Sequence, residues 1–322
     1  MKSRVVLAIG DPAGIGPEIV LRALGDARVR RALEPLVVGD AVALARHAEA
    51  CALAARIEDG RLQVGDLPPV PLIETGSLGG QDWRIGDSTA VTGAACRAYA
   101  LEAIARVRAG EARAAIAAPH TESSVNAAGY RFRGYPGLVA EATGTPEERV
   151  FLMLLSPAYR VVNVTLHEPL IEAVRRLTPE LVANAIRAAH ASLQALGLAR
   201  PRIGVCGINP HAGEGGLMGH EDRAIVAPAV EVARAEGIDA SGPWPADVLF
   251  AGRAYDACVA MYHDQGHIPV KVAAPHSASA ITIGTPVPFG SVAHGSALDI
   301  AGRGRADASA LINALLNVAG AG

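Results

Sequence analysis

The 322-residue sequence is poor in aromatic residues and carries almost no net charge. Aromatic residues make up 4% of it, and the formal net charge is −3. A chain so close to neutrality gives no electrostatic reason to expect a nucleic-acid or an acidic-membrane partner. It also lacks an apolar run of about 18 residues and the pattern of a signal peptide, so we expect a cytoplasmic protein with no membrane segment.

Cysteine is scarce and unpaired in the sequence. The four cysteines, Cys51, Cys96, Cys206 and Cys258, form no CxxC pair, which excludes a disulfide framework and a thiolate zinc site. Cys206 and Cys258 fall in predicted strands, and we expect them to be small buried side chains.

Lysine is the rarest of the charged residues. Among 29 Lys and Arg residues, Lys2 and Lys271 are the only lysines. Lys271 ends the stretch 260–271, which follows an apolar strand and holds two histidines, an aspartate and a glutamine. Because a lysine amine is a compact donor whose pKa falls on burial, we interpret Lys271 as a catalytic residue. The alternative is a chance surface lysine.

What the sequence does contain is an alternation of strand and helix. Half of its residues are hydrophobic, and the pattern predicts strands at 4–9, 114–118, 160–166, 203–208 and 258–261, with helices at 17–24, 89–108 and 179–196. Gly10, Gly14 and Gly16 follow the first strand, but their spacing does not match GxGxxG or a P-loop. We therefore expect a tight turn there, with Asp11 and Glu18 as polar lining or caps, and an α/β fold. The Pro- and Gly-rich stretch 66–86 predicts a long loop or an edge hairpin.

Four of the ten histidines lie close to predicted strand ends: His120, His167, His211 and His263. Ligands bind outside the carboxyl ends of strands in open α/β sheets. Three imidazoles are the ligand set of an open catalytic metal site, and Asp264 beside His263 would orient a ligand or be one. The alternative is that these histidines lie in separate loops and make ordinary hydrogen bonds.

Four blocks of sequence resemble the signature blocks of the 4-hydroxythreonine-4-phosphate dehydrogenase family. They cover residues 10–18, 209–214, 262–266 and 294–302, in the family's order. The resemblance implies an isocitrate-dehydrogenase-like fold of two α/β/α domains around a central cleft, and not a Rossmann fold. We expect residues 1–130 plus 285–322 to form the first domain, and residues 131–284 to form the second, which carries the metal and the dimer contacts.

The resemblance also implies a set of site residues at the subunit interface of a homodimer. His167, His211 and His263 would hold one divalent metal, two from one subunit and His263 from the other, with zinc expected first and Mg, Mn or Co as alternatives. Lys271 would act on the substrate. Asp247 is a second candidate for proton transfer or for holding Lys271, unless it only caps the following helix. NAD or NADP would bind to the loop that contains His294, Gly295, Ser296, Ala297, Asp299, Gly302 and Gly304.

The sequence departs from the family at the substrate. Where members with phosphorylated substrates carry polar residues, this chain has Tyr135, Pro136, Ala280 and Phe289. These four positions cannot pair with a phosphate dianion, whose burial without partners is costly. Tyr135 and Phe289 would instead offer flat surface to a ring. His120 and Arg133 are the nearest candidates for binding a second substrate carboxylate.

Four stretches, at residues 134–136, 164–168, 207–211 and 300–304, resemble most closely the terephthalate cis-dihydrodiol dehydrogenase branch of the family. That branch implies oxidation of 1,2-dihydroxy-3,5-cyclohexadiene-1,4-dicarboxylate to protocatechuate with release of CO2, coupled to NAD(P). Two alternatives stay open. One is a true 4-hydroxythreonine-4-phosphate dehydrogenase of vitamin B6 biosynthesis, and the other is a non-catalytic ligand-binding homologue.

Overall fold

The computed structural model describes residues 2–275 and 278–319 and divides the chain into two compact units. Unit 1 comprises Met1–Ala142 and Val287–Gly322, and unit 2 comprises Thr143–Pro286. The first boundary therefore lies after residue 142, and not after residue 130 as the sequence predicted. The reason is local: Tyr135 donates a hydrogen bond to the Ala118 carbonyl at 2.8 Å, which fastens the segment after residue 130 to unit 1.

Unit 1 is built on a mostly parallel sheet with the strand order β13-β6-β1-β2-β5-β4-β3. β1, β2, β5, β6 and β13 run parallel, and β3 and β4 form an antiparallel edge. The strands are β1 (Ser3–Ala8), β2 (Leu33–Val38), β3 (Ala55–Glu58), β4 (Arg61–Val64), β5 (Val70–Ile73), β6 (Ala114–Ala117) and β13 (Phe289–Val292). The helices are α1 (Gly16–Leu24), α2 (Ala27–Ala32), α3 (Ala41–Ala50), α4 (Ala90–Arg108), α5 (Glu122–Ala127), α6 (Tyr135–Thr143) and α12 (Ser309–Ala319).

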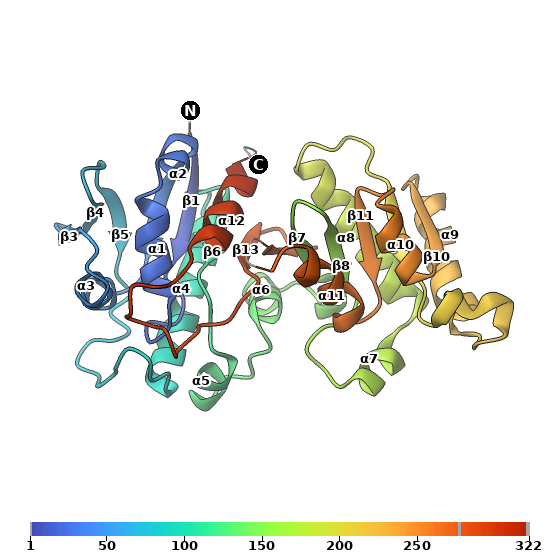
Figure 1. Ribbon diagram of the computed structural model, residues 1–322, viewed down its shortest axis with the longest axis horizontal. Helices are drawn as coiled ribbons and strands as arrows, with labels where there is room; N and C mark the ends of the chain where they lie inside the picture. Colours follow the sequence, from blue (N-terminus) through green and yellow to red (C-terminus); the bar gives the residue numbers. More distant parts are fainter. Residues whose placement is uncertain (1, 276–277, 320–322) are drawn as a thin grey trace. The chain divides into compact units, whose positions relative to one another are not determined.

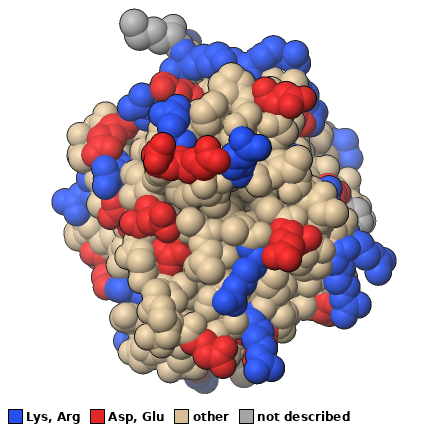
Figure 2. Space-filling view, turned by 90° about the vertical axis from the view of Figure 1, so that its left-hand side faces the viewer, with Lys and Arg blue, Asp and Glu red and all other residues tan. Residues whose placement is uncertain are grey.

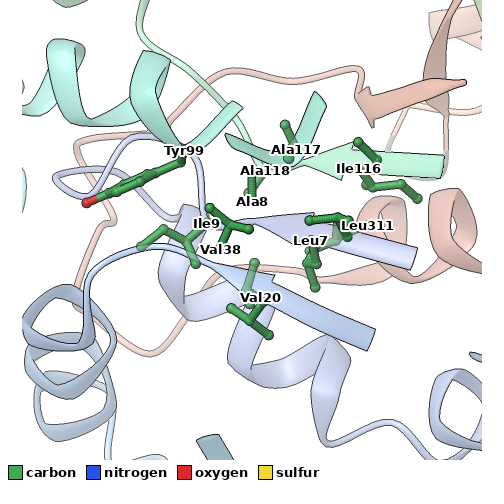
Figure 3. Close-up of a cluster of buried hydrophobic side chains, with 14 of the residues drawn as sticks. Leu7, Ala8, Ile9, Val20, Val38, Tyr99, Ile116, Ala117, Ala118 and Leu311 are labelled. Atoms are coloured by element: carbon green, nitrogen blue, oxygen red, sulfur yellow. The ribbon is translucent and has the colours of Figure 1, made fainter. Parts of the chain in front are cut away.

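The core of unit 1 lies between this sheet and its helices. α1 and α12 contact each other in front of the sheet (Figure 1). Leu7 of β1, Ile116 of β6 and Leu311 of α12 are fully buried together (Figure 3). A central parallel strand is covered on both faces, which explains why these strands read as continuous apolar runs.

Unit 2 has its own sheet, in the order β10-β9-β11-β8-β7-β12. β8, β9, β10 and β11 are parallel to one another, β7 pairs antiparallel with β8, and β12 pairs antiparallel with β7. The strands are β7 (Phe151–Leu155), β8 (Arg160–Asn163), β9 (Ile203–Cys206), β10 (Ala240–Trp244), β11 (Ala257–Ala260) and β12 (Ser279–Ile283). The α-helices are α7 (Leu170–Arg176), α8 (Pro179–Ala195), α9 (Ala227–Ala235), α10 (Ala246–Gly252) and α11 (His263–Ala273). Three short turns complete the unit: η1 (Glu147–Arg149), η2 (Pro210–Gly216) and the π-helical η3 (Asp222–Val226).

Most elements predicted from the sequence are present, with shifted ends. The stretch 66–86 contains the short strand β5 followed by irregular structure. Cys206 and Cys258 are buried in β9 and β11, as expected. Among the described residues, no helix is long and apolar enough to cross a membrane. On the face shown in Figure 2, acidic and basic side chains are interspersed, in keeping with the small net charge.

Candidate active site

The turn between β11 and α11 is the centre of the candidate site in unit 2. Gln265 fastens this turn, because its Oε1 accepts the Met261 N–H at 2.7 Å while its Nε2 donates to the Gly207 carbonyl at 2.8 Å. Thr165, which follows β8, donates to the Met261 carbonyl at 2.8 Å. The ends of β8, β9 and β11 are therefore cross-linked by side chains at the edge where ligands bind in α/β sheets.

The residues after the turn form helix α11, which the sequence did not predict. Gly266 and Pro269 lie inside it, and both residues disfavour a helix interior. Gly266 is required by packing, since a Cβ there would collide with Oδ1 of the buried Asn163. Tertiary contact with β8 thus overrides the local sequence preference.

One face of α11 carries three nitrogen bases at a spacing of four residues: His263, His267 and Lys271. The rings of His263 and His267 are stacked, with centroids 3.7 Å apart and an interplanar angle of 12°. Burial lowers the pKa of His267 to about 4. Burial also lowers the pKa of Lys271, as the sequence analysis expected of an interior lysine.

His167 and His263 come together within the chain. Their ring centroids are 5.4 Å apart, and both line a pocket of about 350 Å³, here called the histidine pocket. Its walls combine apolar and polar side chains: Leu166, His167, Glu168, Leu170, Ala173, Tyr262, His263 and Asp264. The volume falls within the range of small-molecule sites.

His211 lies in an unusual turn, η2, after β9. Its φ is +53°, and the next four residues also have positive φ. The imidazole is 63% exposed, and its Nδ1 donates to Glu214 Oε2 at 3.0 Å. This hydrogen bond raises the pKa of His211, and the charge of Asp247 adds to the effect. Asp247 itself lies in the first turn of α10, where a carboxylate is favoured by the helix dipole.

The three predicted metal ligands lie at two separate places: His167 and His263 line the histidine pocket, and His211 lies in the turn η2. His263 Nδ1 donates to Asp264 Oδ1 at 2.7 Å. In both His211 and His263, Nδ1 is bonded to a carboxylate, which leaves Nε2 to face a metal, the usual pattern for metal-binding histidines. The donor set therefore fits a divalent ion, although no group of three such side chains converges on one point among the residues that the structure describes.

In unit 1, the turn after β1 is closed by its own chain. Asp11 N–H donates to the Pro119 carbonyl at 2.8 Å, Gly14 N–H to the Asp11 carbonyl at 3.0 Å and Ile15 N–H to the Ser296 carbonyl at 2.9 Å. A pyrophosphate on a helix N-terminus needs such amides to be available. Their use within the chain agrees with the sequence, which gave no Rossmann fingerprint.

Of the two roles expected for Asp11 and Glu18, polar lining is wrong, whereas Asp11 does cap the turn by accepting a backbone N–H. Both are fully buried, and each fastens backbone. Asp11 accepts the Ala13 N–H at 2.9 Å and the Ser88 hydroxyl, while Glu18 accepts the Ala306 N–H at 3.1 Å and pairs with Arg22.

The predicted cofactor loop from His294 to Gly304 lies against this closed turn. Arg22 donates to the Gly304 carbonyl at 2.8 Å, and Thr121 donates to the Ser296 hydroxyl at 2.8 Å. Ser296 is buried, whereas Gly295 and Asp299 are exposed. The exposed positions are the part of the loop that could contact a cofactor.

The substitutions at the predicted substrate positions form core rather than surface. Tyr135 and Phe289 have ring centroids 5.1 Å apart and are 2% and 1% exposed, and His120 packs edge-on against Tyr135 at 4.5 Å. Ala280 lies in β12 and is 3% exposed. We expected Tyr135 and Phe289 to offer a flat surface to a substrate ring. Their rings are instead covered, because Tyr135 points inward and donates to the Ala118 carbonyl. Pro136, in the first turn of α6, is partly exposed.

Sequence reasoning missed Asn163, Gln265 and Asp222 as structural parts of the site. Asn163 is a polar residue at the end of the apolar strand β8, and that contrast is a signal the sequence does carry. Asp222 accepts three N–H groups from residues 208 and 209, and no local pattern marks it.

Comparison with known proteins assigns the chain to one family of dehydrogenases. Residues 31–318 match the family model described as pyridoxal phosphate biosynthetic protein PdxA. The chain belongs to this family, and it is a dehydrogenase.

Two curated relatives and one solved structure illustrate the range of the similarity. The 1,2-dihydroxy-3,5-cyclohexadiene-1,4-dicarboxylate dehydrogenase of Comamonas sp. is 45% identical over 97% of this chain and 96% of its own length. The D-threonate 4-phosphate dehydrogenase of Cupriavidus necator is 43% identical over 96% and 94%. A terephthalate 1,2-cis-dihydrodiol dehydrogenase structure from Burkholderia xenovorans LB400 is 41% identical, with a TM-score of 0.69 over 100% of this chain and 98% of that one.

Proposed function

We propose that the protein oxidises and decarboxylates a cis-dihydrodiol carboxylate, with NAD or NADP as the oxidant. The best candidate substrate is 1,2-dihydroxy-3,5-cyclohexadiene-1,4-dicarboxylate, and the products are protocatechuate, CO2 and NAD(P)H. The observation that carries the proposal is the loss of phosphate partners. Tyr135, Ala280 and Phe289 stand where phosphate-binding polar residues would be expected, and all three are buried. A phosphate dianion held there would lack donors, at a cost of roughly several kcal/mol.

The histidine pocket supports a cyclic substrate. Leu166, Leu170 and Tyr262 supply apolar wall, while His167 and His263 supply polar atoms at one place. Such a mixture suits a flat ring that carries a diol on one side. A flexible phosphorylated amino acid would gain little from the apolar wall.

The proposed reaction balances without another reagent. A hydride leaves the carbon of the secondary alcohol for the nicotinamide, and the hydroxyl proton leaves to a base. The adjacent carboxylate then departs as CO2, its bonding electrons enter the new carbonyl, and one proton returns to the oxygen. Loss of CO2 from this ring restores aromaticity, which makes the step strongly favourable.

Residues of unit 2 would carry the proton chemistry. A divalent ion would supply Lewis-acid polarisation of the diol oxygens, and the nicotinamide would supply a hydride acceptor. Lys271 would take the hydroxyl proton and return one to the developing enol oxygen, which its lowered pKa favours. Asp264 would hold His263 in one orientation through their 2.7 Å hydrogen bond.

In unit 1, the exposed part of the loop from His294 to Gly304 would receive the adenosine part of NAD(P). Gly302 and Gly304 have φ of +71° and +67°, so glycine keeps this backbone unstrained, and a Cβ at Gly302 would collide with Ile85. Asp299 is exposed on the same loop and would face the cofactor's sugar.

We further propose a homodimer whose two subunits share each metal site. Exposed apolar side chains lie on the segments that carry His211 and His263: Leu217 directly follows η2 and is 78% exposed, and Val272 on α11 is 79% exposed. Apolar side chains gathered near polar site residues are typical of an interaction surface. A second copy of the chain would cover these apolar side chains and would also complete a set of three histidine ligands.

Subunit mixing tests the shared site. His211→Ala and His263→Ala dimers should each be inactive, and a dissociated and reassociated mixture should regain about a quarter of wild-type activity, since half of the dimers are mixed and each has one intact site. A mixture of His167→Ala and His263→Ala should also regain activity if His263 crosses the interface. If neither mixture regains activity, the result contradicts a site shared between subunits.

The rival function is oxidation of a phosphorylated hydroxy acid, such as 4-hydroxythreonine 4-phosphate. The relative at 43% identity that is named for D-threonate 4-phosphate favours it. Product stoichiometry tests the proposal directly: incubation with the cis-dihydrodiol dicarboxylate and NAD+ or NADP+ should give equal amounts of reduced nicotinamide, CO2 and protocatechuate. Reduced nicotinamide without CO2 would exclude the decarboxylation.

A further inference from the structure

Two rare backbone conformations meet beside His211. The first is the left-handed turn His211–Gly215, in which five successive residues have φ between +42° and +78°. The second is the π-helical turn Asp222–Val226, which begins a few residues later. L residues disfavour the left-handed region, and π-helical turns are rare outside functional sites.

Glycine accounts for only part of the left-handed turn. Gly213 and Gly215 adopt positive φ without strain, but His211, Ala212 and Glu214 are L residues at +53°, +51° and +42°. Such a conformation persists only when surrounding contacts impose it. Two residues of the π-helical turn contact the left-handed turn: Arg223 donates to the Gly215 carbonyl at 3.3 Å, and the Asp222 side chain lies against Gly213.

Asp222 is the residue that joins the two turns. Its side chain is 1% exposed, and its carboxylate accepts the Ile208 N–H at 2.6 Å, the Asn209 N–H at 3.1 Å and Asn209 Nδ2 at 3.0 Å. Gly207 lies against the same carboxylate, where a Cβ would collide with Asp222 Oδ1 and with Ala212. The backbone from 207 to 209 is thus wrapped around a buried anion immediately before the left-handed turn starts.

We propose that Asp222 is a positioning residue that holds His211 in its metal-binding orientation. This inference rests on the proposed metal site. The carboxylate fixes residues 208 and 209, the fixed backbone forces residues 211–215 into the left-handed turn, and the turn brings Glu214 to His211 Nδ1. The last contact leaves His211 Nε2 to face the metal.

Calorimetric titration of metal-free protein with Co2+ tests this inference. Asp222→Asn replaces one acceptor oxygen by an NH2 group that must face a backbone N–H. We expect it to weaken Co2+ binding about 10- to 100-fold, the range for a partner that orients a ligand, and to change the visible absorption of bound Co2+. Asp239→Asn is the matched control, because Asp239 is an exposed aspartate of the same unit, and it should bind Co2+ like wild type.

A rescue variant separates positioning from general stability. Ala212→Gly removes the penalty for positive φ, so the double variant Asp222→Asn/Ala212→Gly should regain much of the lost Co2+ affinity. A purely structural role for Asp222 would give no such recovery. If Asp222→Asn does not fold, Asn209→Ala serves in its place: it removes one donor to the carboxylate and should weaken Co2+ binding by a smaller factor.

The outcomes distinguish this inference from the proposed function. Failure of the wild-type protein to bind Co2+ would overturn the metal site itself. Wild-type affinity in folded Asp222→Asn, or in Asn209→Ala when it is used instead, would overturn the role of Asp222 and leave the metal site standing.

Discussion

Two glycine-rich turns follow parallel strands in this protein, one in each unit, and they differ in where their polar atoms point. The turn Gly10–Gly16 after β1 directs its amides to carbonyls of its own chain, and its one acidic residue, Asp11, is buried. The turn Pro210–Gly216 after β9 is left-handed and presents His211, which is 63% exposed. A turn at the carboxyl end of a strand is therefore not by itself a ligand site. It can bind a ligand only if its polar atoms are not already bonded within the chain.

The proposed function assigns the proton chemistry to unit 2, and its largest expected effect is at Lys271. Lys271→Arg keeps the charge but cannot lose a proton near neutral pH, so kcat should fall by about two to four orders of magnitude. Steady-state formation of NADH with the dihydrodiol measures it. A variant with more than a tenth of wild-type kcat would contradict a proton-transfer role.

The pH profile sharpens the same prediction. Burial lowers the pKa of Lys271 from its ordinary value of 10.5, so kcat should rise with pH and level off below 10.5. The sign for stability is the same: below the folded pKa the charged amine carries the full burial penalty, and above 10.5 the penalty is gone. As the pH rises from the pKa of Lys271 in the folded protein to 10.5, the free energy of unfolding should therefore increase. Lys271→Met should remove this pH dependence.

The exposed turn makes a second prediction. His211→Ala should lower activity by at least about a hundredfold by removing a metal ligand, with little change in thermal stability, because the side chain lies mostly in solvent. His220→Ala, a nearby histidine without an assigned role, is the control and should stay within about twofold. A large loss of folded protein in His211→Ala would instead assign His211 to the structure.

For the closed turn Gly10–Gly16 we expect a change in stability, in contrast to the exposed turn. Gly14→Ala would bring a Cβ into contact with the Cβ and carbonyl oxygen of Ser296, so we expect a loss of about 1–3 kcal/mol of unfolding free energy and a higher KM for NAD(P)+. Gly137→Ala is the matched control, since no atom lies near its Cβ position and alanine favours a helix. Denaturant unfolding and cofactor kinetics measure the pair. An unchanged KM for NAD(P)+ in Gly14→Ala would separate the loop from cofactor binding.

The smallest expected effect concerns the cysteines of both units. Burial raises the pKa of Cys258 to about 12, and burial also raises the pKa values of Cys96 and Cys206. A thiol reagent at pH 8 should therefore modify Cys51 first, because it is the only one of the four with partial exposure. Mass spectrometry of the labelled protein gives the order, and early modification of Cys206 or Cys258 would show that unit 2 opens.

The sequence predicted the parallel strands because buried strands form apolar runs that local patterns reveal. It failed at α11, where Gly266 and Pro269 disfavour a helix but contact with Asn163 requires the glycine. It also failed at the His211 turn, since that conformation depends on Asp222, eleven residues away. The identities at Tyr135 and Phe289 were visible in the sequence, but their burial was not, because it depends on packing in unit 1.

The central claim is the substrate, and a comparison of kcat/KM for two compounds tests it most directly. The protein should turn over 1,2-dihydroxy-3,5-cyclohexadiene-1,4-dicarboxylate with a kcat/KM at least about a hundredfold above that for 4-hydroxythreonine 4-phosphate, because the residues that replaced the phosphate partners offer no hydrogen-bond donor to a phosphate group. Efficient turnover of the phosphate ester, with none of the dihydrodiol, would contradict the account.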